Sequence, residues 1–370
     1  MNVVVQPVAG LAAIGDDEAL ACNVEQYLSA EVGAKVEVSG LRRCPAGLSW
    51  LTCGLVARGL PGAAATRELI LRLGTDAGPF APYSPWPQVW ALQSLDGSGV
   101  PVPRVHWASD DTNILGAPFM LCEKVTGAAM APWVSPSEPP LPEAYRIGLG
   151  DQFTDALAAL HRLDWTSRPV ARLARSGTPA DAVTPANAAR RVVADWGALI
   201  ERFAMRPYPL AQWGLRWLER NAPAAPRLAV VHGDYRTGNF LEEGGRITAI
   251  LDWEFVHLGD PHEDLAWVSL PMHMGGSPYL CRLLEPAQFH ARYAEKAGHA
   301  VSMEAMHYYL VFSLLKLAAM HMAAARCFEE GRSNDMRLPA MGSQVATCLR
   351  QMEREIRKGP GPAVDNGLAR

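Results

Sequence analysis

Hydrophobic positions in the first 125 residues change between helical and strand-like spacing. Apolar side chains recur every three to four positions within residues 16–32, which predicts a helix, and again within residues 86–95. Short apolar runs separated by Gly and Pro predict strands. These strands are residues 35–41, 48–58, 69–73 and 119–125, with a hairpin turn at 60–62. The proline-rich residues 100–105 are excluded from a central helix or an inner strand because proline has no N–H to donate.

Helical spacing dominates the rest of the chain. The predicted helices are residues 148–163, 186–203, 210–220, 286–298 and 303–328. Two short apolar strands, residues 228–231 and 247–251, flank a polar loop. The pattern therefore predicts an α+β protein, with a small strand-rich lobe over residues 1–122 and a larger, mostly helical lobe over 123–358. Residues 359–370 are rich in Gly and Pro and are expected to fray.

Composition narrows the class of protein. A chain of 370 residues with 49% hydrophobic side chains is long enough for two lobes with a buried core, so a wholly disordered chain is excluded. The net charge of -4 argues against a nucleic-acid partner, and the longest apolar stretch, residues 311–325, contains Lys316 and His321, which argues against a membrane span. Seven cysteines without a C-x-x-C pair and a start without a basic leader favour a cytoplasmic protein with reduced thiols.

Lysine is scarce in this sequence. Only five of the 34 basic residues are lysine, namely Lys35, Lys124, Lys296, Lys316 and Lys358. Any chemistry that needs a basic side chain must therefore rely mainly on arginine.

The polar loop between the two strands has the composition of a phosphoryl-transfer site. It contains His232 and Asp234, then Asn239 five residues later, and Asp252 at the end of the next strand. In such a site an Asp orients the substrate hydroxyl, while an Asn and a second Asp hold the metal that bridges the phosphates. Carboxylate and amide oxygens suit Mg²⁺. The spacing H-x-D-x-x-x-x-N is the kinase pattern, which predicts metal-assisted phosphoryl transfer.

The loop and the segments after it resemble the aminoglycoside phosphotransferase family of kinase-like enzymes. The resemblance rests on residues 231–267, including Ile250-Leu251-Asp252-Trp253-Glu254, Leu258-Gly259-Asp260-Pro261 and Asp264-Leu265-Ala266-Trp267. It is strongest with the branch associated with acyl-CoA dehydrogenases. It implies a bilobal protein-kinase-like fold, ATP or GTP with Mg²⁺ as cofactors, and an adenine site near residues 120–125, with Glu123 among the nucleotide-binding residues.

The resemblance also assigns roles within the loop. Asp234 matches the catalytic aspartate and Asn239 and Asp252 match the metal ligands. Arg236 lies where many kinases have a lysine that neutralises the γ-phosphoryl, and its guanidinium suits phosphate. His232 is expected to order the loop rather than to move protons.

Further along, Asp260 and Asp264 match residues that brace this loop. His262 is expected to be partly exposed, since Ala266 excludes the zinc motif H-E-x-x-H.

In the first lobe the resemblance is weaker. Gly47 and Ser49 lie in the turn where the family holds phosphate, but Ala46 and Trp50 replace a Gly and an Asn of the family pattern. Arg72 must serve as the basic phosphate-binding residue, because no lysine occurs between Lys35 and Lys124. Gln88 falls where the family has the glutamate that pairs with this basic residue. We expect an Arg72–Gln88 hydrogen bond or a more distant partner for Arg72.

The acceptor is expected to be a small molecule with a hydroxyl group. Residues 165–230, where the family builds its substrate site, contain ten arginines, no lysine and four acids, which favours an anionic acceptor such as a hydroxyacyl-CoA over a cationic aminoglycoside. Solvated arginines on helix surfaces are the ordinary alternative. An apolar wall for the acceptor could be supplied by Tyr208, Trp213, Trp217, Trp267 and residues 272–274. Core packing is the more usual role of Trp and Met at helical spacing.

Three other functions remain open from the sequence. One is an aminoglycoside-type antibiotic kinase. Another is a catalytically weak nucleotide-binding pseudokinase, suggested by Trp50 and Gln88. The last is a metal-dependent phosphohydrolase in which His232, Asp234 and Asp252 would bind the metal.

Overall fold

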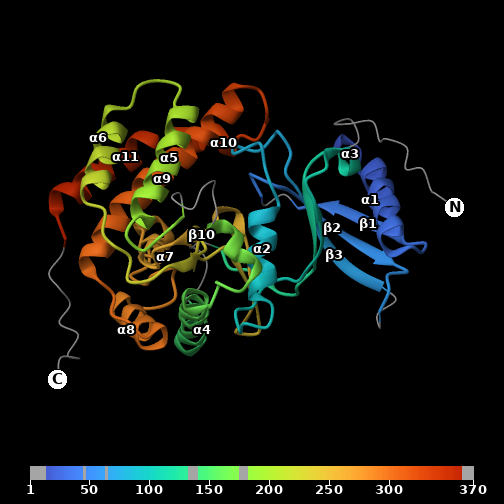
Figure 1. Ribbon diagram of the computed structural model, residues 1–370, viewed down its shortest axis with the longest axis horizontal. Coiled ribbons are helices and arrows are strands. Elements are labelled where there is room, and N and C mark those ends of the chain that lie inside the picture. Colours follow the sequence, from blue (N-terminus) through green and yellow to red (C-terminus); the bar gives the residue numbers. More distant parts are fainter. Residues whose placement is uncertain (1–13, 45–46, 63–65, 132–140, 175–181, 361–370) are drawn as a thin grey trace. The chain divides into compact units, whose positions relative to one another are not determined.

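A computed structural model describes residues 14–44, 47–62, 66–131, 141–174 and 182–360 (Figure 1). Contacts divide the chain into two compact units. The first unit comprises Met1–Val89, Pro103–Lys124 and Gly331–Asn334, and the second comprises Trp90–Val102, Val125–Glu330 and Asp335–Arg370.

The first unit is built on a five-stranded antiparallel sheet with the strand order β1-β2-β3-β5-β4. Its strands are β1 (Glu37–Arg43), β2 (Leu51–Arg58), β3 (Thr66–Leu73), β4 (Val105–Ser109) and β5 (Phe119–Glu123), and its helices are α1 (Asp17–Val32) and α3 (Thr112–Leu115). Leu20, Val24 and Leu28 of α1 are fully buried against alternate residues of the strands, which form one hydrophobic core. Helix α2 (Trp86–Leu95) follows β3 along the chain.

The strand-rich first part is confirmed, with two additions. The helices at 16–32 and 86–95 are found, and the four predicted strands are found with ends displaced by up to three residues. Strands β2 and β3 pair from Arg58 and Thr66 onward, as a hairpin requires, although residues 63–65 of the connection lie outside the described part. Strand β4 and helix α3 were not predicted, because the prolines just before β4 concealed where its pairing begins.

The second unit consists mainly of helices around two small sheets. Its helices are α4 (Glu143–Arg162), α5 (Ala188–Phe203), α6 (Pro209–Arg220), α7 (His262–Val268), α8 (Pro286–Ala297), α9 (Met303–Glu329), α10 (Arg337–Gly342) and α11 (Val345–Lys358), with single 3₁₀ turns at η2 (Pro169–Ala174), η4 (Trp253–Phe255) and η5 (Pro271–Met274). The strands are β6 (Ala128–Ala129), β7 (Ala229–Val231), β8 (Phe240–Glu243), β9 (Arg246–Ile250) and β10 (His257–Gly259). Strands β7 and β10 pair antiparallel, and β8 lies between β6 and β9.

Helix α9 is the central element of the second unit. It packs against α5, α6, α7, α10 and α11. By length and composition alone α9 could cross a membrane, but 78% of its most apolar window is buried inside the structure, which is typical of a core helix. The five predicted helices are all present, whereas α11 was not predicted although its buried Val345, Cys348, Leu349 and Met352 follow helical spacing.

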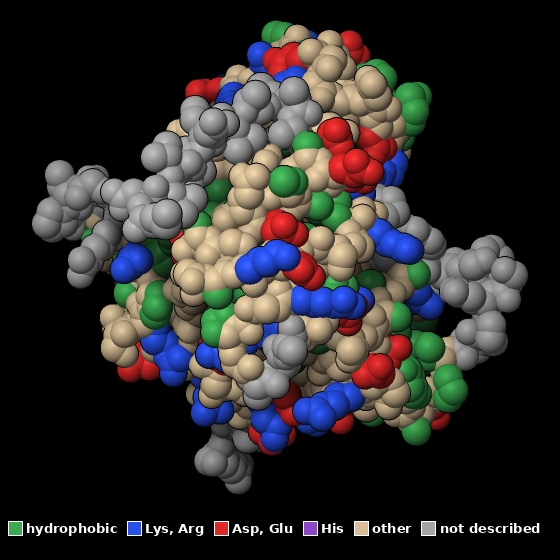
Figure 2. Space-filling model, turned by 90° about the vertical axis from the view of Figure 1, so that its right-hand side faces the viewer, with side chains coloured by type: hydrophobic (Ala, Val, Ile, Leu, Met, Phe, Trp, Pro, Cys, Tyr) green, Lys and Arg blue, Asp and Glu red, His purple; other side chains and the backbone are tan. Residues whose placement is uncertain are grey.

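Charged side chains of both signs lie on the face of the molecule shown in Figure 2. Lys and Arg side chains are interspersed there with Asp and Glu side chains. This agrees with the small net charge of the chain.

Candidate active site

The loop between β7 and β8 places Asp234 in a buried position with three hydrogen-bond donors around its carboxylate. Oδ1 accepts from Arg236 Nε at 3.0 Å and from the indole Nε1 of Trp267 at 2.7 Å. Oδ2 accepts from Asn239 Nδ2 at 2.7 Å, and the same amide donates to the Asp234 carbonyl at 2.9 Å. The structure therefore brings together three of the predicted residues, and it adds Trp267 to them.

The surroundings of Asp234 favour its ionised form. Burial alone raises the pKa of a carboxyl, but the Arg236 guanidinium and the Asn239 hydrogen bond hold the pKa of Asp234 below its ordinary value. An ionised carboxylate offers about four acceptor positions, and three are used here. Asp234 thus retains the capacity to accept a hydrogen bond from a substrate hydroxyl.

His232 orders the backbone of the loop, as expected from the sequence. Its Nε2 donates to the Leu251 carbonyl at 2.9 Å, and its Nδ1 accepts from the Asp234 N–H at 3.1 Å. These roles require the neutral ring, and burial lowers the pKa of His232 against the opposing effect of Asp264. The histidine therefore holds the Asp234 amide and is already occupied at both nitrogens.

The carboxylate of Asp264, in α7, binds the backbone of the same loop. Its Oδ2 accepts from the His232 N–H at 2.8 Å and lies 3.1 Å from Nε2 of His161, while its Oδ1 accepts from the Gly233 N–H at 2.8 Å. The Nδ1 of His161 in turn lies 2.7 Å from the Tyr293 hydroxyl. The Asp264 side chain is fully buried. Its carboxylate therefore provides the hydrogen-bond acceptors for two backbone N–H groups that have no partner in a strand.

The predicted metal ligands lie on adjacent segments. The N–H of Leu251, just before Asp252, donates to the Asn239 carbonyl at 2.7 Å. Because the amide nitrogen of Asn239 faces Asp234, its side-chain oxygen is the atom that can bind a cation. Asp252 has a φ of +64°, a conformation that Asp tolerates better than most residues and that often marks functional sites. Two hard oxygen donors fit Mg²⁺ here, and the bound ion would neutralise phosphate charge.

Arg72 and Gln88 of the first unit form a hydrogen bond, which is one of the two alternatives predicted for Arg72. Arg72 Nη1 donates to Gln88 Oε1 at 3.0 Å, and Gln88 is 2% exposed. The guanidinium also lies 5.7 Å from the Trp50 ring centroid, and Trp50 packs against Tyr83 at 5.0 Å. Trp50, which departs from the family pattern, therefore supports Arg72 by a cation–π contact.

The other residues predicted to bind nucleotide lie on the same unit. Gly47 and Ser49 belong to the bend before β2, and a Cβ on Gly47 would lie 3.0 Å from the Trp50 carbonyl, so the turn is tight there. Ala46 lies outside the described residues. Glu123 is at the end of β5, where its carboxylate accepts from the Arg104 N–H at 3.1 Å.

One expectation about a side chain is wrong. His262 is 2% exposed rather than partly exposed, because Asp260 accepts its ring N–H at 2.7 Å and its Nε2 accepts from the Ser302 N–H. Two of the tryptophans weighed for a substrate wall are packed inside the second unit instead, as the alternative interpretation from helical spacing predicts. Trp267 is buried next to Asp234, and the half-buried Trp217 stacks on Tyr308 of α9 at 6.1 Å.

Sequence reasoning also missed Lys316 and His273 near the loop. Lys316 Nζ donates to the Gly233 carbonyl at 2.7 Å, from a helix far along the chain. His273 donates from Nδ1 to the Trp267 carbonyl at 2.8 Å, and burial, then Arg236, lowers the pKa of this histidine to about 4. A charged residue inside an apolar helix was the available signal for Lys316.

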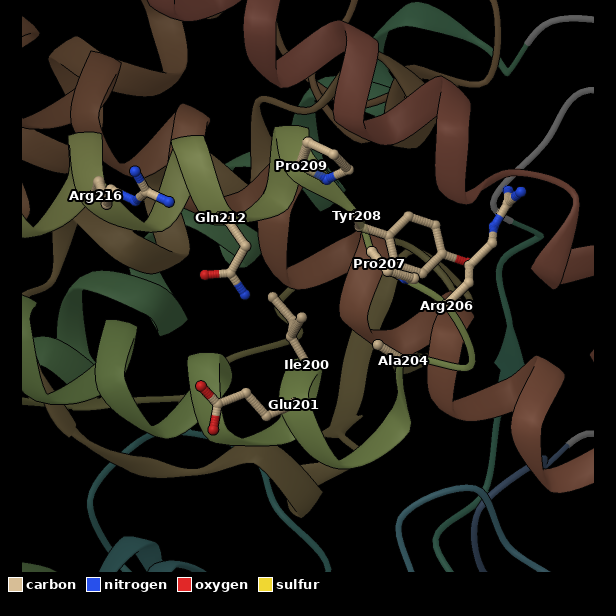
Figure 3. Close-up of a pocket in the computed structure, with 9 residues that line it drawn as sticks. All are labelled: Ile200, Glu201, Ala204, Arg206, Pro207, Tyr208, Pro209, Gln212 and Arg216. Carbon is tan, nitrogen blue, oxygen red and sulfur yellow. The ribbon is translucent and has the colours of Figure 1, made fainter.

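A pocket of about 340 Å³ lies between α5 and α6 in the arginine-rich region (Figure 3). In Figure 3 Gln212 of α6 and Ile200 and Glu201 of α5 line the space between the helices, while Tyr208 and Arg206 lie at the loop end. The pocket is lined by Ile200, Glu201, Ala204, Arg206, Pro207, Tyr208, Pro209, Gln212 and Arg216. The walls are mostly apolar and carry two arginines and one glutamate, which suits a ligand that is part apolar and part polar.

Comparison with known proteins identifies relatives of this chain. A model of the phosphotransferase enzyme family matches residues 62–302. Acyl-CoA dehydrogenase family member 10 of Mus musculus is 29% identical over 188 residues, which are 50% of this chain and 16% of that protein. Acyl-CoA dehydrogenase family member 11 of Homo sapiens is 30% identical over 181 residues, 48% of this chain and 22% of that protein. The chain thus spans less than a quarter of these relatives, and the predicted resemblance to this branch is confirmed.

Solved structures share the fold. A putative aminoglycoside phosphotransferase from Ralstonia eutropha JMP134 aligns with a TM-score of 0.69 at 21% identity, over 91% of this chain and 98% of that one. A macrolide 2'-phosphotransferase from Brachybacterium faecium gives 0.54 at 20% identity, over 87% and 96%. An aminoglycoside phosphotransferase variant in complex with ADP and hygromycin B gives 0.55 at 16% identity, over 92% and 100%. The predicted kinase-like fold class is confirmed.

Proposed function

The chain belongs to the phosphotransferase enzyme family, and we propose that it transfers the γ-phosphoryl group of ATP or GTP to a hydroxyl of a small molecule. The observation that carries this proposal is the carboxylate of Asp234, which is buried, ionised and oriented by Arg236, Trp267 and Asn239. In the transfer the acceptor oxygen forms a bond to the γ-phosphorus, the bond to the leaving ADP oxygen breaks, and the hydroxyl proton passes toward Asp234.

The two units supply different parts of this reaction. We assign nucleotide binding to the first unit, through Arg72 held by Gln88 and through the turn at Gly47 and Ser49. Asn239 and Asp252 of the second unit would hold Mg²⁺. A solved structure of the same fold contains ADP, which supports nucleotide use.

For the acceptor we propose an anionic molecule with an apolar portion, of the hydroxyacyl-CoA type. The pocket between α5 and α6 supports this choice, because its two arginines, Arg206 and Arg216, outnumber its one acid, Glu201, and an excess of positive charge favours anionic groups over a polycationic antibiotic. Helix α5 lines the pocket with Ile200 and Glu201 and, one turn earlier, contacts the segment that follows Asp252. Trp196, one helical turn before Ile200, packs against Phe255 of the segment that follows Asp252.

Binding and turnover of Asp234→Ala test the catalytic proposal. Thermal stabilisation by Mg·ATP and Mg·GTP should be preserved in this variant, while ADP formation with an acceptor panel should be lost. Asp155→Ala, which removes an exposed carboxylate paired with Arg292, is the matched control and should behave as wild type. Undiminished turnover in Asp234→Ala would refute the role of Asp234, and nucleotide binding without turnover in the wild type would favour a pseudokinase.

Acceptor class is tested by transfer to hydroxyacyl-CoAs, sugars and aminoglycosides, followed by mass spectrometry of the phosphorylated product. For a hydroxyacyl-CoA we expect Arg206→Ala with Arg216→Ala to raise KM about tenfold or more with little change in kcat, since charge-assisted hydrogen bonds are lost in binding. Arg220→Ala, exposed on the same helix outside the pocket, is the control. Preferential phosphorylation of aminoglycosides would refute the anionic acceptor while leaving the reaction type intact.

A further inference from the structure

Lys316 is a buried cation enclosed by aromatic rings. Its side chain is 1% exposed, and Nζ lies 5.0 Å from the ring centroid of Trp267, 5.2 Å from Trp196, 5.6 Å from Phe255 and 5.9 Å from Phe312. Ring faces attract an ammonium group, but they do not replace the hydrogen bonds that it makes in water. The placement of this group therefore depends on which acceptors it reaches.

Two acceptors lie within hydrogen-bond distance of the ammonium. Lys316 Nζ donates to Glu263 Oε1 at 2.9 Å and to the Gly233 carbonyl at 2.7 Å. The second oxygen of Glu263 lies 3.0 Å from Nε2 of His257, so the carboxylate is satisfied on both sides. Burial alone would raise the pKa of Glu263, but Lys316 and His257 bring it down to about 2. The lysine thus joins an ion pair to the backbone of the catalytic loop.

The acceptor carbonyl belongs to the peptide bond that precedes Asp234. At the other side of that peptide plane, the Asp234 N–H donates to His232 Nδ1. Gly233 itself has a φ of +83°, and a Cβ there would lie 2.7 Å from the Phe255 carbonyl. With Lys316 and His232 on opposite sides, rotation of this peptide plane is blocked. Since the plane carries the Asp234 Cα, its orientation sets the direction of the carboxylate.

We propose that Lys316 is a positioning residue for phosphoryl transfer, because its ammonium group fixes the Gly233 carbonyl and so aims the Asp234 carboxylate at the acceptor hydroxyl. The inference rests on the proposed function of Asp234. Stability alone gives little reason for the charge, since buried ion pairs replaced by apolar groups of similar volume are often neutral in stability. An apolar side chain at position 316 could not donate a hydrogen bond to the Gly233 carbonyl.

The decisive variant removes both charges together. Lys316→Met with Glu263→Gln removes both charges of the ion pair and nearly conserves volume, and the neutral amide at position 263 no longer favours a charged His257. Lys316→Met alone leaves the Glu263 carboxylate without its lysine partner. For the double variant we expect retained folding and an unchanged KM for ATP, with kcat for ADP formation from Mg·ATP lowered about tenfold to a hundredfold, as small misplacements of reacting groups cause. Lys296→Met, an exposed lysine on α8, is the control. Wild-type kcat in the folded double variant would overturn the proposal.

Hydrogen exchange provides a readout that needs no turnover. In the nucleotide-free double variant the amides of residues 233–235 should exchange about tenfold or more faster, while those of α9 keep their wild-type protection. Unchanged exchange in the loop would overturn the inference by itself. If wild type forms no ADP with any acceptor, the proposed function fails, and faster loop exchange would still support the positioning by Lys316.

Discussion

Replacing Asp264 by Asn tests how strongly α7 holds the loop that carries Asp234. Asp264 accepts the N–H groups of His232 and Gly233 and the ring N–H of His161, all of them buried. An Asn side chain keeps one oxygen, which can serve His232 and His161 as a neutral acceptor, but its NH₂ then faces the Gly233 N–H. One charge-assisted bond worth about 2 kcal/mol is lost, two are weakened by about 1 kcal/mol each, and a buried donor is left unsatisfied. Asp264→Asn should therefore cost about 3–5 kcal/mol.

The assay is urea unfolding followed by tryptophan fluorescence, with Asp155→Asn as the exposed control. At an m value of about 3 kcal/mol/M, the expected loss moves the midpoint by about 1 M or more. Turnover should fall as well, because Gly233 and Asp234 lose their anchor. A midpoint within about 0.3 M of wild type together with unchanged kcat would refute the inference that this carboxylate holds the loop, since that shift is about 1 kcal/mol.

Three further changes probe the neighbouring groups. The pKa of Glu263 is about 2 in the folded state against 4.5 ordinarily, so its ionisation contributes about 3 kcal/mol to the free energy of unfolding above pH 4.5, and this contribution is lost as the pH falls toward 2. Between about pH 5 and pH 2 the free energy of unfolding should therefore fall by about that much more in wild type than in Glu263→Gln. Parallel pH curves for the two proteins would contradict this. Gly233→Ala forces a Cβ against a backbone carbonyl and should lower kcat about a hundredfold. In the control Gly244→Ala, at φ +60°, the added Cβ has no atom within 4 Å, and kcat should stay near wild type. Equal effects of the two substitutions on kcat would exclude the steric explanation. Gln88→Glu gives Arg72 a charged partner and should tighten ATP binding about fivefold by calorimetry, so weaker or equal binding would argue against a role of this pair in nucleotide binding.

Much of the catalytic loop could be predicted because its residues are close in sequence. Asp234, Asn239 and His232 lie within eight positions, so the loop closes locally and spacing alone constrains their geometry. The Arg72–Gln88 contact was also predictable, because no lysine occurs between Lys35 and Lys124 and no glutamate between Arg72 and Glu123. Helix and strand periodicity gave most elements because burial in this chain follows the pattern of apolar positions.

The supporting residues could not be predicted in the same way. Trp267 reaches Asp234 from 33 positions away and Lys316 reaches Gly233 from 83 positions away. Both contacts depend on how α7 and α9 pack in the second unit. Sequence periodicity predicts that a face is buried but not which atoms meet there, so it indicates neither the Trp267–Asp234 nor the Lys316–Gly233 hydrogen bond.

The hydrogen bond from Trp267 to Asp234 makes the ionisation of the Asp234 carboxylate observable by spectroscopy. An indole N–H that donates to a carboxylate resonates at a proton frequency set by that acceptor, so ionisation of Asp234 should be read from the Trp267 side-chain signal in ¹H–¹⁵N spectra. The chain has eleven tryptophans, few enough for indole signals to be assigned by single substitutions. Arrival of an acceptor hydroxyl at Asp234 would displace the same signal, which would let acceptors be recognised by binding before any phosphate is transferred.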